Sequence, residues 1–150
     1  MKRISDITAM VVDTGLFVEL ARTLGKEYKK VYYCYPSWVT PFPKMNGQLV
    51  GSGFEEIETV LSPFEHFDDI DLFVFPDVGY GEMQVYFESV GKAVWGCKKG
   101  EELEFYRDTC KELMKELSLS VGKYAVIKGI DALRDYLKYN EDQWVKINRV

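Results

Sequence analysis

The chain has 150 residues with a formal net charge of −5, and 47% of its residues are hydrophobic and 15% aromatic. This length suits one ordinary domain, or one domain with part of a second, and the apolar fraction permits a substantial core. The acidic balance excludes a protein that binds nucleic acid non-specifically, because that activity needs a basic face.

The N-terminus and the cysteines indicate the cellular compartment of the protein. Asp6 and Asp13 interrupt the apolar run that a signal peptide needs, and no run is long enough to cross a bilayer. Cys34, Cys97 and Cys110 are odd in number and scattered, unlike a disulfide framework or a zinc site. We therefore expect a cytoplasmic protein with no membrane partner and no structural metal.

The first 35 residues predict a strand, a helix and a second strand. The apolar run ITAMVV, residues 7–12, has strand length and is broken by a turn at residues 13–15. Residues 16–24 carry one apolar stripe at helical spacing, and the run VYYCY at 31–35 is the next strand. This order indicates an α/β fold with a parallel sheet.

The turn after the first strand is a candidate ligand site. A nucleotide-binding Rossmann turn has three glycines at fixed spacing, whereas this turn has only Gly15. A dinucleotide-dependent oxidoreductase is therefore the least favoured function. Two interpretations stay open: Asp13, Thr14 and Gly15 face some other substrate, or they form an ordinary turn between a strand and a helix.

The next segment is irregular. Residues 36–53 contain three prolines and three glycines and follow the end of a strand, so they suit a lid, a packed surface loop or a partner contact. Residues 54–61 predict a short edge strand or a helical turn. Ser62 and Glu65 match a capping box, which predicts a short helix after them.

A second strand–helix–strand unit follows. The apolar run at residues 72–75 predicts a buried strand, which Pro76 ends because it has no N–H for the ladder. A helix is expected from Gly81 to Gly91, and residues 92–95 predict the next strand.

The last third has a different character. Residues 101–117 predict one helix with an apolar stripe, and Arg107 and Lys111 lie beside that stripe, on a face that is either solvated or anion-binding. Residues 124–127 and 144–147 predict strands that flank a helix at 131–139. This unit has no layer to cover it, so we expect exposed apolar area.

The blocks from Asp71 onward, ending in GKAVWG and LEFYRDTCKELMKELSLSVGKYAVI, resemble the start of the ATP-grasp ligases. Among those ligases the sequence is most similar to the glycinamide ribonucleotide synthetases (phosphoribosylamine–glycine ligases) of purine biosynthesis. The resemblance implies a Rossmann-like, three-layer pre-ATP-grasp domain over residues 1–98. It also implies that residues 99–150 are a linker helix and the incomplete start of an α+β ATP-grasp subdomain.

The resemblance also implies binding residues. Arg107 and Lys146 fall on two basic positions at which the family contacts ATP phosphates. Lys111 matches a second common lysine of the family, but we expect it to have a structural role. Pro76 and Asp77 stand where those synthetases have a Gly-Pro-Glu motif. With Asp13, Thr14 and Gly15, they are the candidate substrate-binding residues.

The implied reaction activates a carboxylate as an acylphosphate, which an amine then attacks, with ATP and Mg²⁺ as cofactors. The family's glycine-rich phosphate loop and metal-binding acids would lie beyond residue 150. We therefore expect this chain to hold no catalytic or metal-binding residue and to bind ATP weakly. The alternative is a non-catalytic Rossmann-like binding module that associates with itself or with a partner through its exposed C-terminal unit.

Overall fold

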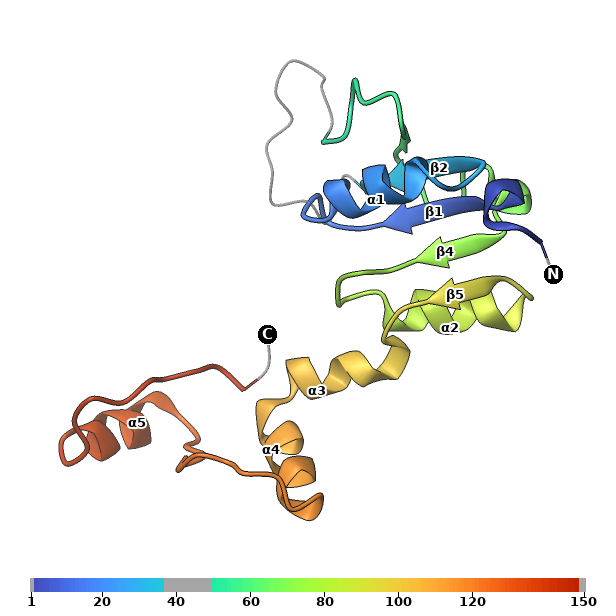
Figure 1. The fold of residues 1–150 in the computed structure, drawn as a ribbon. Helices are drawn as coiled ribbons and strands as arrows, with labels where there is room; N and C mark the ends of the chain where they lie inside the picture. Colours follow the sequence, from blue (N-terminus) through green and yellow to red (C-terminus); the bar gives the residue numbers. More distant parts are fainter. Residues whose placement is uncertain (1, 37–49, 149–150) are drawn as a thin grey trace. The chain divides into compact units, whose positions relative to one another are not determined.

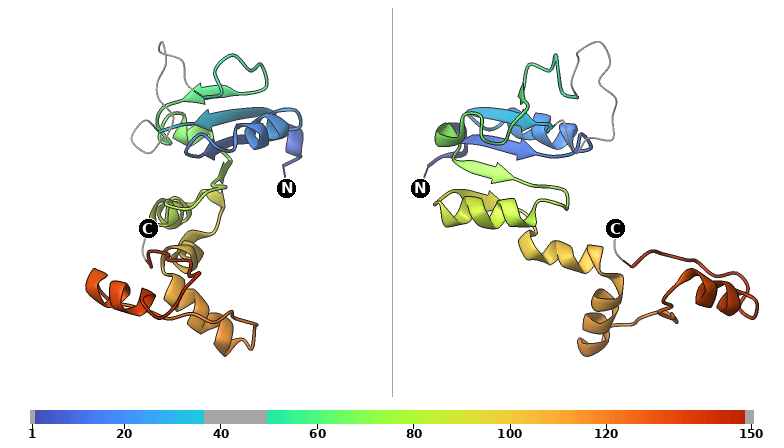
Figure 2. Two further views of the ribbon diagram at one scale, coloured as in Figure 1. Left: turned by 90° about the vertical axis from the view of Figure 1, so that its left-hand side faces the viewer. Right: turned by 180° about the vertical axis from the view of Figure 1, so that it is seen from behind.

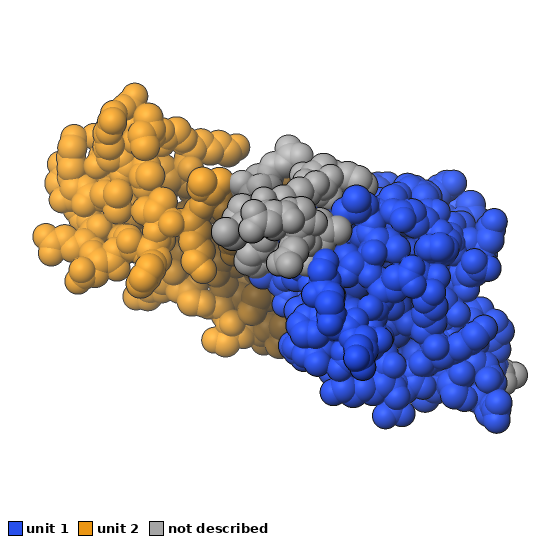
Figure 3. All heavy atoms as spheres, turned by 90° about the horizontal axis from the view of Figure 1, so that it is seen from above, with its two compact units in different colours: residues 1–99 blue, residues 100–150 orange. Residues whose placement is uncertain are grey.

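The computed structural model describes residues 2–36 and 50–148. The strands are β1 (Thr8–Val12), β2 (Lys30–Cys34), β3 (Glu58–Val60), β4 (Leu72–Val74) and β5 (Ala93–Trp95). The α-helices are α1 (Val18–Gly25), α2 (Gly81–Ser89), α3 (Glu102–Phe105), α4 (Arg107–Glu116) and α5 (Ile130–Leu137). The chain forms two compact units, residues 1–99 and 100–150, described separately below (Figure 3).

Unit 1 contains a five-stranded sheet in the order β3-β2-β1-β4-β5, and every neighbouring pair is parallel (Figure 1). This confirms the predicted α/β class and parallel sheet. On one side of β1 lie β2 and then β3, and on its other side lie β4 and then β5. The sheet is therefore doubly wound, and its order reverses between β1 and β4.

Helices cover both faces of the sheet, which gives three layers (Figure 2). Alternate residues of a strand point to opposite faces, so Met10 and Val12 join one core and Ala9 and Val11 the other. Buried Phe87 of α2 packs into the first core, and buried Ala21 of α1 packs into the second. These continuous apolar strands match a sheet that is buried on both sides.

The segment before β4 departs from its prediction. The capping box forms, because the Phe64 amide donates to the Ser62 hydroxyl and the Ser62 amide donates to the Glu65 carboxylate. No α-helix follows it, and the chain makes turns and a short 3-10 helix at Phe67–Asp69. Residues 54–61 contribute β3 at the sheet edge, and residues 37–49 of the predicted loop lie outside the described residues.

The prediction of one helix over residues 101–117 was wrong, because the helix breaks at Tyr106 between α3 and α4. Asn148 accounts for the new start at Arg107. Its backbone carbonyl accepts from the Arg107 amide, and its side-chain oxygen accepts from the Asp108 amide at 2.9 Å. The first amides of a helix have no acceptor within the helix. Here Asn148, which is distant in sequence, accepts hydrogen bonds from two such amides at the start of α4.

The strands predicted at 124–127 and 144–147 were also wrong, because both segments have no regular secondary structure and pair with no strand among the described residues. Of the residues predicted there, Trp144 is 94% exposed and Ile147 78% exposed. The helix predicted at 131–139 is confirmed as α5, and the Asn140 side chain donates to the Tyr136 carbonyl at its end. Unit 2 therefore exposes apolar area, as expected.

Among the residues that the structure describes, no helix is long and apolar enough to cross a membrane.

Candidate functional site

The order of the sheet reverses between β1 and β4, and in open parallel sheets ligands bind beyond the carboxyl ends of the strands at such a point. The residues that follow the two strands, 13–17 and 75–81, form what we call the switch-point edge. The Thr14 hydroxyl donates to the Asp77 carboxylate at 3.0 Å across this edge. The structure therefore brings together Asp13, Thr14, Gly15, Pro76 and Asp77, the candidate substrate-binding residues of the sequence.

Asp13 has a structural environment. Its side chain is fully buried, and its carboxylate accepts hydrogen bonds from the amides of Leu16 and Phe17 at 3.2 and 2.7 Å. The Tyr33 hydroxyl donates to the same carboxylate at 2.5 Å. The Thr14 hydroxyl also lies within hydrogen-bond distance of it, at 3.4 Å. A buried carboxylate with these donors is held in place and is closed to solvent. Direct contact between this carboxylate and a substrate does not fit that burial, so Asp13 shapes the turn.

Tyr33 is a residue of this region that sequence reasoning missed. It lies on β2 opposite Val11 of β1, where its ring is in the core. Burial raises the pKa of its phenol well above the ordinary value, and the hydrogen bond to Asp13 raises the pKa further. The sequence feature that could have indicated this bond is a tyrosine inside an apolar strand. A buried phenol needs a hydrogen-bond partner, so such a tyrosine predicts a polar group nearby.

Thr14 and Asp77 are half-buried polar side chains of the switch-point edge, beside the exposed apolar side chains of Leu16 and Phe17, whereas Gly15 is buried. The Asp77 carboxylate also accepts from the Val78 amide at 2.9 Å. Gly15 has a backbone φ of 107°, a conformation that favours glycine and lets the turn form after β1. This arrangement offers hydrogen-bond acceptors to a ligand from a fixed scaffold.

The two cations that the family resemblance suggested lie together in unit 2. Arg107 begins α4, Lys146 lies in an extended segment, and both line one hollow of about 650 Å³, which we call the unit-2 hollow. Its lining also includes Lys111, Lys123, Tyr124 and Trp144. The Arg107 Nε atom is buried and has no hydrogen-bond partner in the described part of the chain. A buried cationic donor without a partner suits an anionic ligand.

Lys111 has a partner within its own unit. Its ammonium lies 4.9 Å from the centre of the Tyr124 ring, and Lys115 approaches the same ring at 4.5 Å. These contacts agree with the structural role that the resemblance implies for Lys111.

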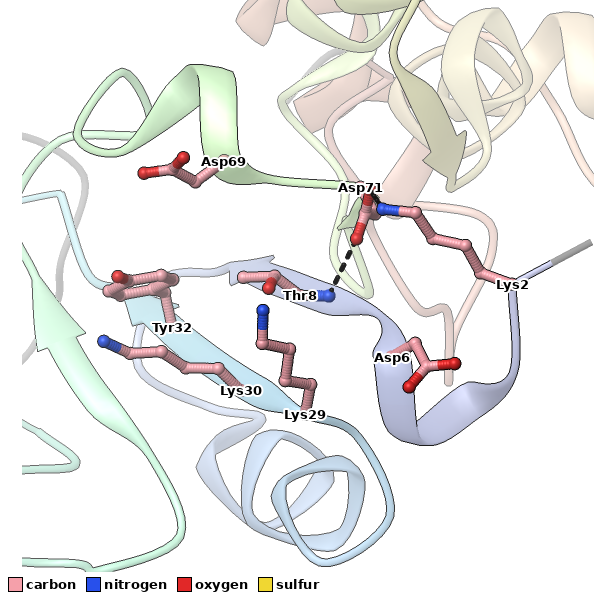
Figure 4. Close-up of a pocket in the computed structure, with 8 residues that line it drawn as sticks. All are labelled: Lys2, Asp6, Thr8, Lys29, Lys30, Tyr32, Asp69 and Asp71. Carbon is pink, nitrogen blue, oxygen red and sulfur yellow. Dashed lines mark hydrogen bonds and ion pairs between the residues drawn. The ribbon is translucent and has the colours of Figure 1, made fainter.

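A second hollow of about 330 Å³ lies at the opposite edge of the sheet, by the amino ends of β1, β2 and β4 (Figure 4). The Lys2 ammonium pairs with Asp71 there, and Asp71 also accepts from the Thr8 amide at 3.0 Å. The hydrogen bond from Lys2 lowers the pKa of Asp71. Its three lysines and three aspartates balance in charge, and this edge is not where open parallel sheets bind ligands.

Within residues 2–36 and 50–148, no group of three or more His, Cys, Asp or Glu side chains is arranged to hold a metal ion. The implied magnesium therefore has no ligand set among these residues. We derive no chemical step from it.

No protein-family model matches this chain, and no curated protein matches it.

Proposed function

We propose that the chain is the N-terminal part of an ATP-dependent carboxylate–amine ligase. In this account, unit 1 holds a small carboxylate or amine substrate at the switch-point edge, and unit 2 contributes cations for the phosphates of ATP. The observation that carries the proposal is that Arg107 and Lys146 line one hollow, with the Arg107 Nε atom buried and without a hydrogen-bond partner among the described residues.

The lining of the unit-2 hollow supports a nucleotide over a simple anion. Arg107, Lys111, Lys123 and Lys146 contribute four cations, against the two acids Asp108 and Asp142. Arginine can donate two parallel hydrogen bonds to a phosphate, whereas lysine acts as a point charge. The remaining lining is largely apolar, which suits the base of a nucleotide.

ATP supplies the phosphoryl group that activates the substrate carboxylate, and an amine then displaces phosphate from the acylphosphate. The contribution of Arg107 and Lys146 to this reaction is charge neutralisation and positioning. The chain is assigned no metal ligand and no catalytic residue. We propose a reducing cytoplasm as its compartment, because its three cysteines are free thiols.

A calorimetric titration of the chain with ATP tests the proposal. Lys146 is exposed, so we expect weak binding with a dissociation constant on the order of millimolar. Arg107→Gln and Lys146→Gln should each weaken binding several-fold. Lys128→Gln is the matched control, because Lys128 is an exposed lysine of unit 2 that does not line the hollow.

Two results would contradict the proposal. If Lys128→Gln weakened ATP binding as much as Arg107→Gln and Lys146→Gln, ATP affinity would depend only on the total charge of the chain. Sub-micromolar affinity would mean that the hollow is a complete nucleotide site rather than a part of one.

The second candidate function is a non-catalytic module that associates with a second copy of itself through unit 2. It is favoured by the exposure of Tyr139, Trp144 and Ile147, which are 87%, 94% and 78% exposed. Sedimentation analysis should then show a dimer that dissociates on dilution. A monomer at every concentration would exclude this function.

A further inference from the structure

The cavity of about 330 Å³ by the amino ends of β1, β2 and β4, which we call the amino-edge hollow, has a fully polar lining (Figure 4). Each of its eight lining residues carries a charge or a hydroxyl, with three lysines, three aspartates, Thr8 and Tyr32. Its volume is at the small end of the range for ligand pockets, which begins at about 300 Å³. A hollow of this size and composition suits a small polar ligand.

Most of the charges around the amino-edge hollow are already neutralised within the chain. Four of the six charged side chains have an ion-pair partner: Lys2 with Asp71, Lys30 with Glu58, and Asp6 with Arg3. Lys29 and Asp69 have no ion-pair partner among residues 2–36 and 50–148. One ammonium and one carboxylate are therefore available to a ligand.

These two side chains approach the hollow from different segments. Lys29 directly precedes β2, and its amide donates to the Ile7 carbonyl at 3.1 Å. Asp69 ends the 3-10 helix before β4, and its amide donates to the His66 carbonyl at 2.9 Å. In Figure 4 the side chain of Thr8 lies between the two. A ligand in the hollow can thus meet a positive group on one side and a negative group on the other.

Thr8 adds an uncharged polar group to the hollow. The residue is only 8% exposed, and its amide donates to the Asp71 carboxylate at 3.0 Å. Its hydroxyl has no hydrogen-bond partner in the described part of the chain, and it points to the side on which Lys29 lies (Figure 4). Polar side chains that are this buried are ordinarily hydrogen-bonded. The Thr8 hydroxyl can therefore donate to a ligand carboxylate that pairs with Lys29.

We infer that the amino-edge hollow binds a small zwitterion, such as a free amino acid, with its carboxylate at Lys29 and Thr8 and its ammonium at Asp69. A ligand with one charge would leave either Lys29 or Asp69 without an opposite charge, so the lining favours a zwitterion over a simple anion or cation. This edge is opposite to the one at which open parallel sheets bind their main ligand. The site is therefore additional to the two sites of the proposed function and does not rest on them.

Residue-resolved NMR titrations of the full chain test the inference with three probes. L-Alanine is the zwitterion, while propionate lacks its ammonium and ethylamine lacks its carboxylate. Alanine should shift the amide signals of Thr8, Lys29 and Asp69 in a saturable way. Ion pairs of exposed side chains contribute little, so we expect a dissociation constant on the order of millimolar. Propionate and ethylamine should each bind about fivefold more weakly than alanine.

Variants of the lining separate specific binding from an effect of total charge. Lys29→Gln and Asp69→Asn should each weaken alanine binding about fivefold, because each removes one of the two opposite charges. Thr8→Val keeps the shape of the side chain without its hydroxyl and should weaken binding about threefold. Lys26→Gln and Asp68→Asn are the matched controls, because both residues are exposed, precede the tested residues closely and do not line the hollow. Both controls should bind alanine as the unchanged chain does.

Four outcomes would overturn the inference. Propionate or ethylamine could bind as tightly as alanine, the controls could weaken binding as much as Lys29→Gln and Asp69→Asn, alanine could shift only Thr14 and Asp77, or alanine could shift no signal. The tested side chains of Lys29 and Asp69 are exposed, so these two variants should stay folded. None of these titrations uses ATP, so their failure is distinguishable from failure of the ligase proposal.

Discussion

Asp13 and Asp77 follow neighbouring strands, yet their surroundings give them different roles. Asp13 is fully buried and accepts from two amides and a phenol, while Asp77 is half-buried and faces Thr14. A carboxylate in the first setting stabilises the turn, and one in the second can accept from a ligand. Burial and donor count, rather than residue type, separate the two.

Replacing Tyr33 by phenylalanine removes one donor from the buried Asp13 carboxylate. Hydrogen bonds to charged groups contribute more than neutral ones, so Tyr33→Phe should lower the free energy of unfolding by about 1.5–3 kcal/mol. Tyr86→Phe is the control, since Tyr86 is 53% exposed and its change should stay within about 0.5 kcal/mol. Urea denaturation measures both. Equal losses in the two variants would contradict the role assigned to the Tyr33 hydroxyl.

The raised pKa of Tyr33 also predicts a loss of stability at alkaline pH. The phenol ionises near pH 10 in the unfolded chain but resists ionisation in the folded one, so the unfolded state releases the proton first. The contribution of Tyr33 is therefore complete below about pH 10 and is lost as the pH rises further. The free energy of unfolding should fall more steeply above that pH in the unchanged chain than in Tyr33→Phe. Parallel curves would contradict this prediction.

At the scale of elements, similar strand-like runs have different outcomes in the two units. Residues 72–74 become β4 because β1 and β5 hydrogen-bond to this segment on either side, and Phe73 is fully buried. Residues 124–127 and 144–147 have strand-like composition but no strand partner within residues 2–36 and 50–148. A strand is stabilised by its cross-strand partners, so composition alone does not determine it.

Helix α2 is attached to the sheet by an aromatic cluster centred on Phe87. This ring is fully buried and contacts Phe64, Phe67, Phe73 and Phe75, with centroid separations from 4.5 to 6.0 Å. Phe87→Ala leaves a cavity at the centre of the cluster, so it should lower the free energy of unfolding by about 3–5 kcal/mol.

Tyr86→Ala is the matched control for Phe87→Ala, because it truncates the adjacent aromatic residue of the same helix on its exposed side. Its loss should be much smaller, by denaturation under the same conditions. A similar loss in both variants would mean that helix propensity, rather than packing, controls the result.

The sequence was sufficient for the sheet and the position of the site, but not for contacts between distant residues. Apolar runs and turns predicted β1, β2, β4 and β5, while residues 54–61, which contain β3, were left open between an edge strand and a helical turn. The Tyr33–Asp13 bond needs the register of β1 and β2, and the break at Tyr106 needs Asn148. Such contacts join residues that are far apart in sequence. The hydrophobic periodicity within one helix or strand therefore cannot predict them.

At the scale of the whole molecule, we propose that each compact unit holds a different ligand. Unit 1 has a complete core and two carboxylates at the switch-point edge, whereas unit 2 has cations around a hollow and no fully buried helix residue among those described. A substrate group that donates hydrogen bonds fits the first, and a nucleotide phosphate fits the second.

A residue-resolved NMR titration of the full chain with ATP tests this division most directly. We predict that ATP shifts the signals of residues 100–148, with the largest changes at Arg107 and Lys146, and leaves Thr14, Leu16 and Phe17 unmoved. Saturable shifts at Leu16 and Phe17, with Arg107 and Lys146 unmoved, would place the nucleotide in unit 1 and contradict the account.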